Sequence, residues 1–90
     1  MARKRKIKVV IKKLGRDKAV GMAYFGLDLI EVDERQTPRE FLGSLGHELA
    51  HLHWPSASES KILAFERDLK RILWAAGYRR IYPDKKKMKS

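Results

Sequence analysis

Residues 37–53 combine the start of a capped helix with two histidines four positions apart, and this feature limits the possible folds more than any other. Thr37, Pro38 and Glu40 supply the N-cap, first and third positions of a capping box. Apolar side chains then recur every three or four residues, which predicts one buried stripe along an amphipathic helix. The stripe consists of Phe41, Leu42, Leu45, Leu49 and Leu52.

The histidine pair belongs to the motif His47-Glu48-Leu49-Ala50-His51. Residues four apart lie on one face of a helix, so His47 and His51 can offer two imidazoles to a single zinc ion. Glu48 stands one step round the helix, where a carboxylate can reach a zinc-bound water and act as general base. The alternative is a solvent-facing helix with two unrelated histidines, but the capped helix favours a metal site.

A zinc ion needs a third protein ligand, and the sequence predicts that it is a carboxylate. The chain has no cysteine, and its third histidine, His53, is the last one. On a continuing helix His53 would point away from His51, and a histidine at a helix end is explained by the helix dipole. The ligand is therefore expected among the glutamates that follow.

A second helix is predicted from about Ser58 to Ala76. Pro55 cannot continue the first helix, and it biases Trp54 away from helical angles. Gly77 supplies the C-terminal stop. The apolar stripe of this second helix consists of Ile62, Phe65, Leu69, Ile72, Leu73 and Ala76.

Two glutamates lie along the same flank of the second helix. A short turn would return its first residues beside His51, which favours Glu59 as the third ligand. Glu66 is the alternative ligand, although it lies about 10 Å further along the helix. Without a metal, Glu59 would be a capping partner of Ser56, and Glu66 would pair with a nearby lysine.

Three strands are predicted before the first helix. Alternating apolar residues begin at Ile7 and end at Ile11, and two further extended segments cover residues 19–25 and 27–32. Gly15-Arg16-Asp17 and Gly26 are the expected turns. The predicted fold class is α+β: a small, mostly antiparallel three-stranded sheet, followed by the helix of the histidine motif and a second, glutamate-bearing helix.

The chain has 90 residues and a formal net charge of +10, and the basic residues gather at its ends. Residues 1–18 carry nine lysines and arginines against one aspartate, and residues 79–90 carry six against one. Such ends can attract nucleic acid nonspecifically, although such a run of lysines is more often just a solvated tail. We expect one domain with flexible ends at about 1–5 and 83–90. No signal peptide or membrane span is expected, which favours a soluble, cytoplasmic protein.

The His-Glu-x-x-His motif with a glutamate on the following helix resembles the gluzincin zinc metallopeptidases. Residues 30–80 carry the likeness, and their compactness is similar to the minigluzincins and the short phage-type metallopeptidases. A more distant similarity is to the ImmA/IrrE-type peptidases. The resemblance implies one minimal zincin-like domain, residues 1–90, that binds one Zn²⁺ per chain. Larger gluzincins place an orienting aspartate four residues after the ligand glutamate, and this chain departs from that pattern because Leu63 stands there.

The expected activity is hydrolysis of peptide bonds by zinc-activated water, with Glu48 as general base. A peptide would bind in extended form beside a sheet edge, for which Tyr24, Phe25 and Gly26 are the expected rim. Tyr78 or Tyr82 could donate a hydrogen bond to the oxyanion, although packing is the commoner role for such tyrosines. The alternative function is a nucleic-acid-binding or protein-interaction module with a structural or incidental metal site and no hydrolysis.

Overall fold

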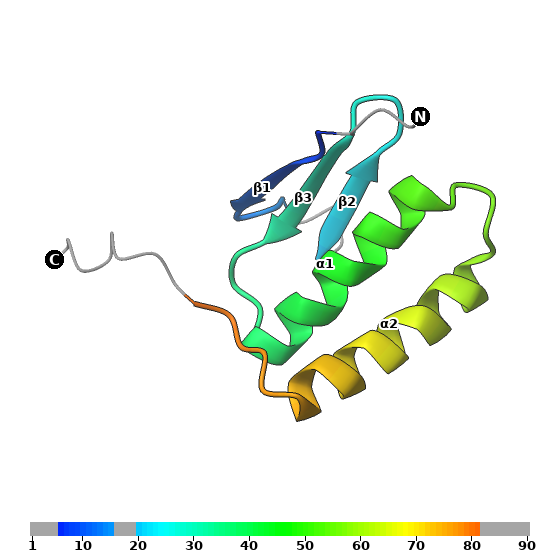
Figure 1. Ribbon diagram of the computed structural model, residues 1–90. Coiled ribbons are helices and arrows are strands. Elements are labelled where there is room, and N and C mark those ends of the chain that lie inside the picture. Colours follow the sequence, from blue (N-terminus) through cyan, green and yellow to red (C-terminus); the bar gives the residue numbers. More distant parts are fainter. Residues whose placement is uncertain (1–5, 16–19, 82–90) are drawn as a thin grey trace, which may run out of the picture.

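A computed structural model describes residues 6–15 and 20–81 of the chain. The elements follow in the order β1 (Lys8–Lys12), β2 (Gly21–Tyr24), β3 (Leu29–Asp33), α1 (Pro38–His53) and α2 (Glu59–Ala75) (Figure 1). This is the predicted α+β arrangement, with the sheet first and two helices after it. The predicted flexible ends lie outside the described residues, as do Arg16, Asp17 and Tyr82.

The three strands form one mixed sheet in the order β1-β3-β2. β2 and β3 are antiparallel, as expected for strands joined by a short turn, and Ala23 lies opposite Ile30. β1 runs parallel to β3 on its other side, with Val9 opposite Ile30. The sheet is therefore not wholly antiparallel, and β2 is an edge strand.

Helix α1 covers one face of this sheet. Ile30 and Val32 of β3 are fully buried, and they form the core together with Phe41 and Leu52 of α1. Ile7, Ala23 and Leu45 pack around this cluster. The helix lies over β2 and β3 but not over β1, so Val9 and Ile11 of β1 remain about half exposed.

Helix α2 lies beside α1 on the side opposite the sheet, and among the described helices and strands it packs on α1 alone (Figure 1). Gly43 and Gly46 of α1 allow this close approach, because a Cβ atom on Gly46 would collide with the side chain of Leu69. Contact with a single neighbour buries only Ile62 of the stripe predicted for α2. Leu49 of α1, predicted in the buried stripe, is 39% exposed, although it lines a shallow pocket with Phe65 and Leu69 of α2.

Both helices begin and end close to the predicted residues. The Thr37 hydroxyl accepts a hydrogen bond from the N–H of Glu40 at 3.3 Å, and Ser58 caps α2 through the N–H of Lys61 at 3.2 Å. Gly77 follows α2 with φ of +98°, the left-handed conformation that favours glycine at a helix end. Neither helix is long and apolar enough to cross a membrane, as far as the described residues go.

Asp33 and Arg35 join the end of β3 to the segment after β1. The buried Asp33 carboxylate accepts hydrogen bonds from the Arg35 guanidinium at 2.6 Å and from the N–H of Leu14 at 3.1 Å. Arg35 also donates to the carbonyl of Leu14 at 3.0 Å. These bonds, chiefly those from Arg35, hold the pKa of Asp33 well below its usual range.

Candidate metal centre

Helix α1 brings His47 and His51 together on its face towards α2. Their positions four residues apart bring the two rings edge to face with centroids 4.8 Å apart, and the Nε2 atoms lie 3.2 Å from each other. Both side chains are partly buried, with 13% of His47 and 22% of His51 exposed. The helix alone therefore places two nitrogen donors at one point, as the motif predicts.

Glu59 reaches the same point from the first turn of α2. One carboxylate oxygen lies 3.2 Å from Nε2 of His47, and the other lies 3.2 Å from Nε2 of His51. A ligand atom from each of the three residues falls within 4.8 Å of the others. The Glu59 side chain is 60% exposed, so this cluster of three residues is open to solvent on the side of Glu59. Two imidazoles and one carboxylate could hold a divalent metal ion here.

Glu66 contacts the opposite edge of the His47 ring. Its Oε1 atom lies 2.8 Å from Nδ1 of His47, whereas the group with Glu59 and His51 forms around Nε2. Oε2 of Glu66 lies 3.9 Å from Nζ of Lys70, one turn further along α2. Of the two glutamates considered as a third ligand, Glu59 lies between the two histidines and Glu66 lies behind one of them.

Glu48 lies at the boundary between α1 and the sheet. Burial raises the pKa of its carboxyl above the ordinary value, and the charges of His47 and His51 partly oppose this shift. Glu59 and Glu66, both acidic, add to the increase. A carboxylate with a raised pKa is better suited to accept a proton near neutral pH.

A shallow pocket of about 340 Å³ adjoins His51. Two of its polar lining residues, His51 and Glu59, belong to the candidate metal centre, and Glu48 supplies the third. The remaining lining residues are apolar: Met22, Ala23, Phe25, Pro55 and Ala57. The ring of Phe25 stands edge-on to His51 with centroids 6.4 Å apart. An extended chain in this pocket would contact β2 on one side and the turn between the helices on the other.

The predicted rim is only partly brought to this pocket. Phe25 lines it, but the Tyr24 hydroxyl donates to Oε1 of Glu31 at 2.9 Å, and Gly26 has φ of +86° in the turn to β3. The residues that sequence reasoning missed are Met22, Ala23, Pro55 and Ala57. Pro55 was the available signal for the last two of these residues. It ends the helix soon after the histidine motif, so the turn that contains Pro55 and Ala57 must lie next to His51.

Tyr78 is not brought to the candidate centre. It follows the C-terminal end of α2 and lines a separate pocket with Pro38 and Phe41 near the start of α1. Glu59 is at the other end of α2, about 24 Å away along a helix of this length. His53 is exposed and lies beside Trp54, away from the paired histidines.

Comparisons of the chain with models of protein families, with curated proteins and with solved structures find no match. The function is therefore inferred from the chemistry of the site.

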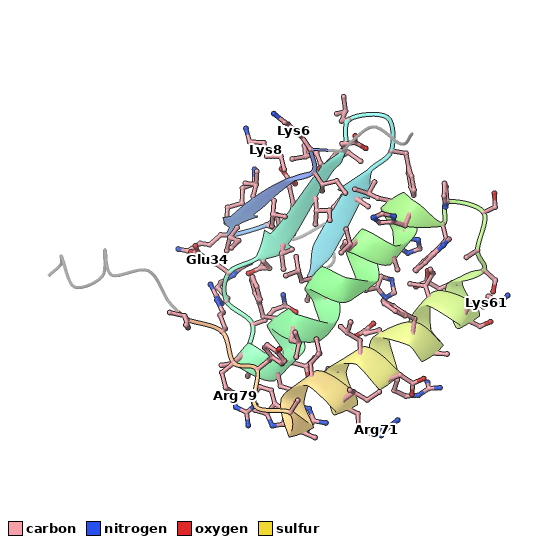
Figure 2. All side chains as sticks on the ribbon, in the orientation of Figure 1. Lys6, Lys8, Glu34, Lys61, Arg71 and Arg79 are labelled. Atoms are coloured by element: carbon pink, nitrogen blue, oxygen red, sulfur yellow. The ribbon has the colours of Figure 1, made fainter. Side chains whose placement is uncertain are left out.

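The described basic side chains are spread over the surface, and two lie close to the candidate centre: Lys61 is in the first turn of α2 with Glu59, and Lys70 contacts Glu66. Lys6 and Lys8 project from the β1 end of the sheet, Arg79 lies near the start of α1, and Arg71 lies on the outer side of α2 (Figure 2). Nonspecific nucleic-acid binding was predicted for the ends of the chain, and most of their basic residues lie outside the described ranges. That partner stays a prediction.

Proposed function

We propose that this chain is a zinc-dependent peptidase of the gluzincin type, in which His47, His51 and Glu59 hold the metal and Glu48 transfers protons. The observation that carries the proposal is the convergence of three donor groups from two helices. The two Nε2 atoms are 3.2 Å apart, and each is 3.2 Å from an oxygen of Glu59. Without a metal ion, this arrangement would hold two imidazole nitrogens and a carboxylate close together in a partly buried place.

The spacing and the chemistry of the donors fit zinc. Around a tetrahedral zinc ion with bonds of about 2.0–2.1 Å, neighbouring ligand atoms are about 3.3–3.4 Å apart. Two histidines and one glutamate form a catalytic type of zinc site, because three protein ligands leave a fourth position open. The exposed side of Glu59 provides access to that position.

When bound, zinc would lower the pKa of a coordinated water and polarise a peptide carbonyl. Glu48 is next to the ligand His47 in sequence but lies on the pocket side of α1 with no ligand role. Its carboxylate would accept a proton from the attacking water and then pass that proton to the leaving nitrogen of the peptide. The raised pKa of Glu48 favours the first of these transfers, in which the carboxylate takes up the proton.

The edge of β2 supports an extended peptide as the substrate. Asp33 of β3 donates its N–H to the carbonyl of Val20 at 2.8 Å. Ladder bonds in an antiparallel pair recur at every second residue, so the peptide groups of Gly21 and Ala23 point away from β3. Gly21 is buried and Ala23 is partly exposed, so a substrate backbone could pair with Ala23 while its scissile bond lies in the pocket beside Glu48 and His51. We place this activity in the cytoplasm, which suits a chain without cysteine.

The test combines metal content with hydrolysis. Protein purified without added metal is analysed for bound metals, and an unfolded protein substrate is then incubated with the untreated, chelated and zinc-restored protein. The expected result is one zinc ion per chain and cleavage that is lost with the metal and regained with zinc. A His47→Ala, His51→Ala double variant should contain no zinc. Salt-sensitive nucleic-acid binding without zinc or cleavage would favour the alternative function.

A further inference from the structure

The two nitrogens of the His47 ring face two different carboxylates. Nε2 lies 3.2 Å from Oε2 of Glu59, within the group that could hold zinc. Nδ1, on the other side of the ring, lies 2.8 Å from Oε1 of Glu66. A distance of 2.8 Å is that of a strong hydrogen bond to a charged acceptor. Glu66 therefore contacts a ring atom that cannot bind the same metal ion as Nε2.

We propose that Glu66 is a positioning residue, which accepts a hydrogen bond from Nδ1–H of His47 and so leaves the lone pair on Nε2. An ionised carboxylate can only accept, which places the hydrogen on Nδ1. In a neutral ring Nε2 then carries no hydrogen, as a zinc ligand requires. This inference rests on the zinc site proposed above, and it changes the role of Glu66 from alternative ligand to orienting partner.

Gly43 makes this contact possible. It lies one helical turn before His47, and a Cβ atom there would be 2.9 Å from Oε2 of Glu66 and 2.8 Å from Cδ of Lys70. Both distances are shorter than real Cβ atoms show. The side chains of Glu66 and Lys70 thus lie against the bare backbone of Gly43, and a larger residue there would push the Glu66 carboxylate away from His47.

The surroundings keep the Glu66 carboxylate in place. Its side chain is 21% exposed, and the Nζ atom of Lys70 lies 3.9 Å from Oε2, on the side away from His47. Leu63 occupies the position at which larger gluzincins carry an orienting aspartate, and it is exposed. A carboxylate one turn further along α2 therefore faces the histidine, and it does so because α2 crosses α1 at a glycine.

The first test measures zinc affinity by competition with a chelator. Glu66→Ala should weaken zinc binding about 10- to 100-fold, the usual effect of losing an outer partner of a zinc histidine. Glu66→Gln retains an oxygen that can accept from Nδ1–H, so it should recover most of the affinity. Asp68→Ala removes an exposed carboxylate from the same helix and should bind zinc as the wild type does.

The second test observes the hydrogen itself by nitrogen NMR of the zinc-loaded protein. The wild type should show a protonated Nδ1 on His47 whose hydrogen exchanges slowly with water, and Glu66→Ala should speed that exchange. Gly43→Ala should give the same change without altering any polar group, because its Cβ displaces the carboxylate. Thermal unfolding of every variant separates this effect from a loss of structure.

Each outcome bears on one of the two proposals. If the wild type binds no zinc, the proposed function fails. If zinc binds but Glu66→Ala leaves both affinity and exchange unchanged, the positioning role is wrong while the zinc site stands. The role is also wrong if Glu66→Ala abolishes zinc binding and Glu59→Ala has no effect, since Glu66 would then be the third ligand.

Discussion

Gly21 lies directly against Glu48, close enough that a Cβ atom on Gly21 would be 2.9 Å from Cγ and 3.1 Å from Oε2 of Glu48. The first residue of β2 therefore forms a wall behind the proposed general base. Gly21 is buried and has no positive φ, so an alanine could adopt its backbone conformation but would push the glutamate side chain aside.

Gly21→Ala should therefore reduce peptide hydrolysis and leave zinc binding intact. A displacement of about 1 Å can lower the rate about 100-fold, so a loss of about 10- to 100-fold is expected in kcat/KM. The matched control is Gly15→Ala, because a Cβ atom at Gly15 has nothing within 4 Å. Equal hydrolysis by wild type and Gly21→Ala would show that this contact does not position Glu48.

Glu59→Ala should weaken zinc binding by more than about 100-fold, which exceeds the usual effect of an outer partner. The reason is that Glu59 places its carboxylate beside Nε2 of both histidines, whereas Glu66 reaches only Nδ1 of His47. The measurement is zinc competition on Glu59→Ala and Glu66→Ala side by side. The opposite order of affinities would assign the ligand role to Glu66.

Phe25→Ala should lower kcat/KM about tenfold without loss of zinc, because it removes an apolar wall of the pocket beside His51. Leu27→Ala is the control, since Leu27 is 67% exposed and is not among the residues that line this pocket. Peptides of one length with different side chains next to the cleaved bond provide the assay. An effect of Leu27→Ala as large as that of Phe25→Ala would contradict the assignment of the pocket to substrate.

Asp33→Asn should destabilise the protein most at neutral pH. The folded-state pKa of Asp33 is depressed, so ionised Asp33 contributes stability above its unfolded-state pKa of about 3.9, and this contribution falls as the pH decreases below that value. Denaturant unfolding of wild type and variant at about pH 7 and about pH 3 measures the difference. A difference that grows towards low pH would mean that the bonds to Arg35 and Leu14 do not stabilise the folded state.

Local signals predicted the helices and the paired histidines. The N-cap Thr37 and the stop at Gly77 act within a few residues, so the sequence alone predicts them, whereas the cap of α2 is Ser58 and not Ser56. The four-residue spacing of His47 and His51 likewise determines their relative placement once the helix exists. The position of Glu59 beside the histidines was also predicted, because a short turn leaves the start of α2 beside the end of α1.

Long-range packing determined what could not be predicted. β1 pairs in parallel with β3 and not with its neighbour in sequence, β2. The alternating apolar residues of β1 are compatible with a parallel or an antiparallel partner, so the sequence did not predict this pairing. The contact between Glu66 and His47 depends on α2 crossing α1 at Gly43. Tyr78 is a different case, because the predicted length of the second helix was already enough to separate it from the histidines.

The central claim is that the chain hydrolyses peptides and that Glu48 moves the proton, and Glu48→Gln tests both most directly. The amide keeps the shape of the side chain but cannot accept a proton, so zinc content and thermal stability should stay close to those of the wild type. Hydrolysis should fall about 10²- to 10⁴-fold, the usual effect of losing a general base. Cleavage of an unfolded protein is measured for both proteins, with chelator-treated samples as blanks. A Glu48→Gln variant that retains zinc and cleaves as fast as the wild type would contradict the account.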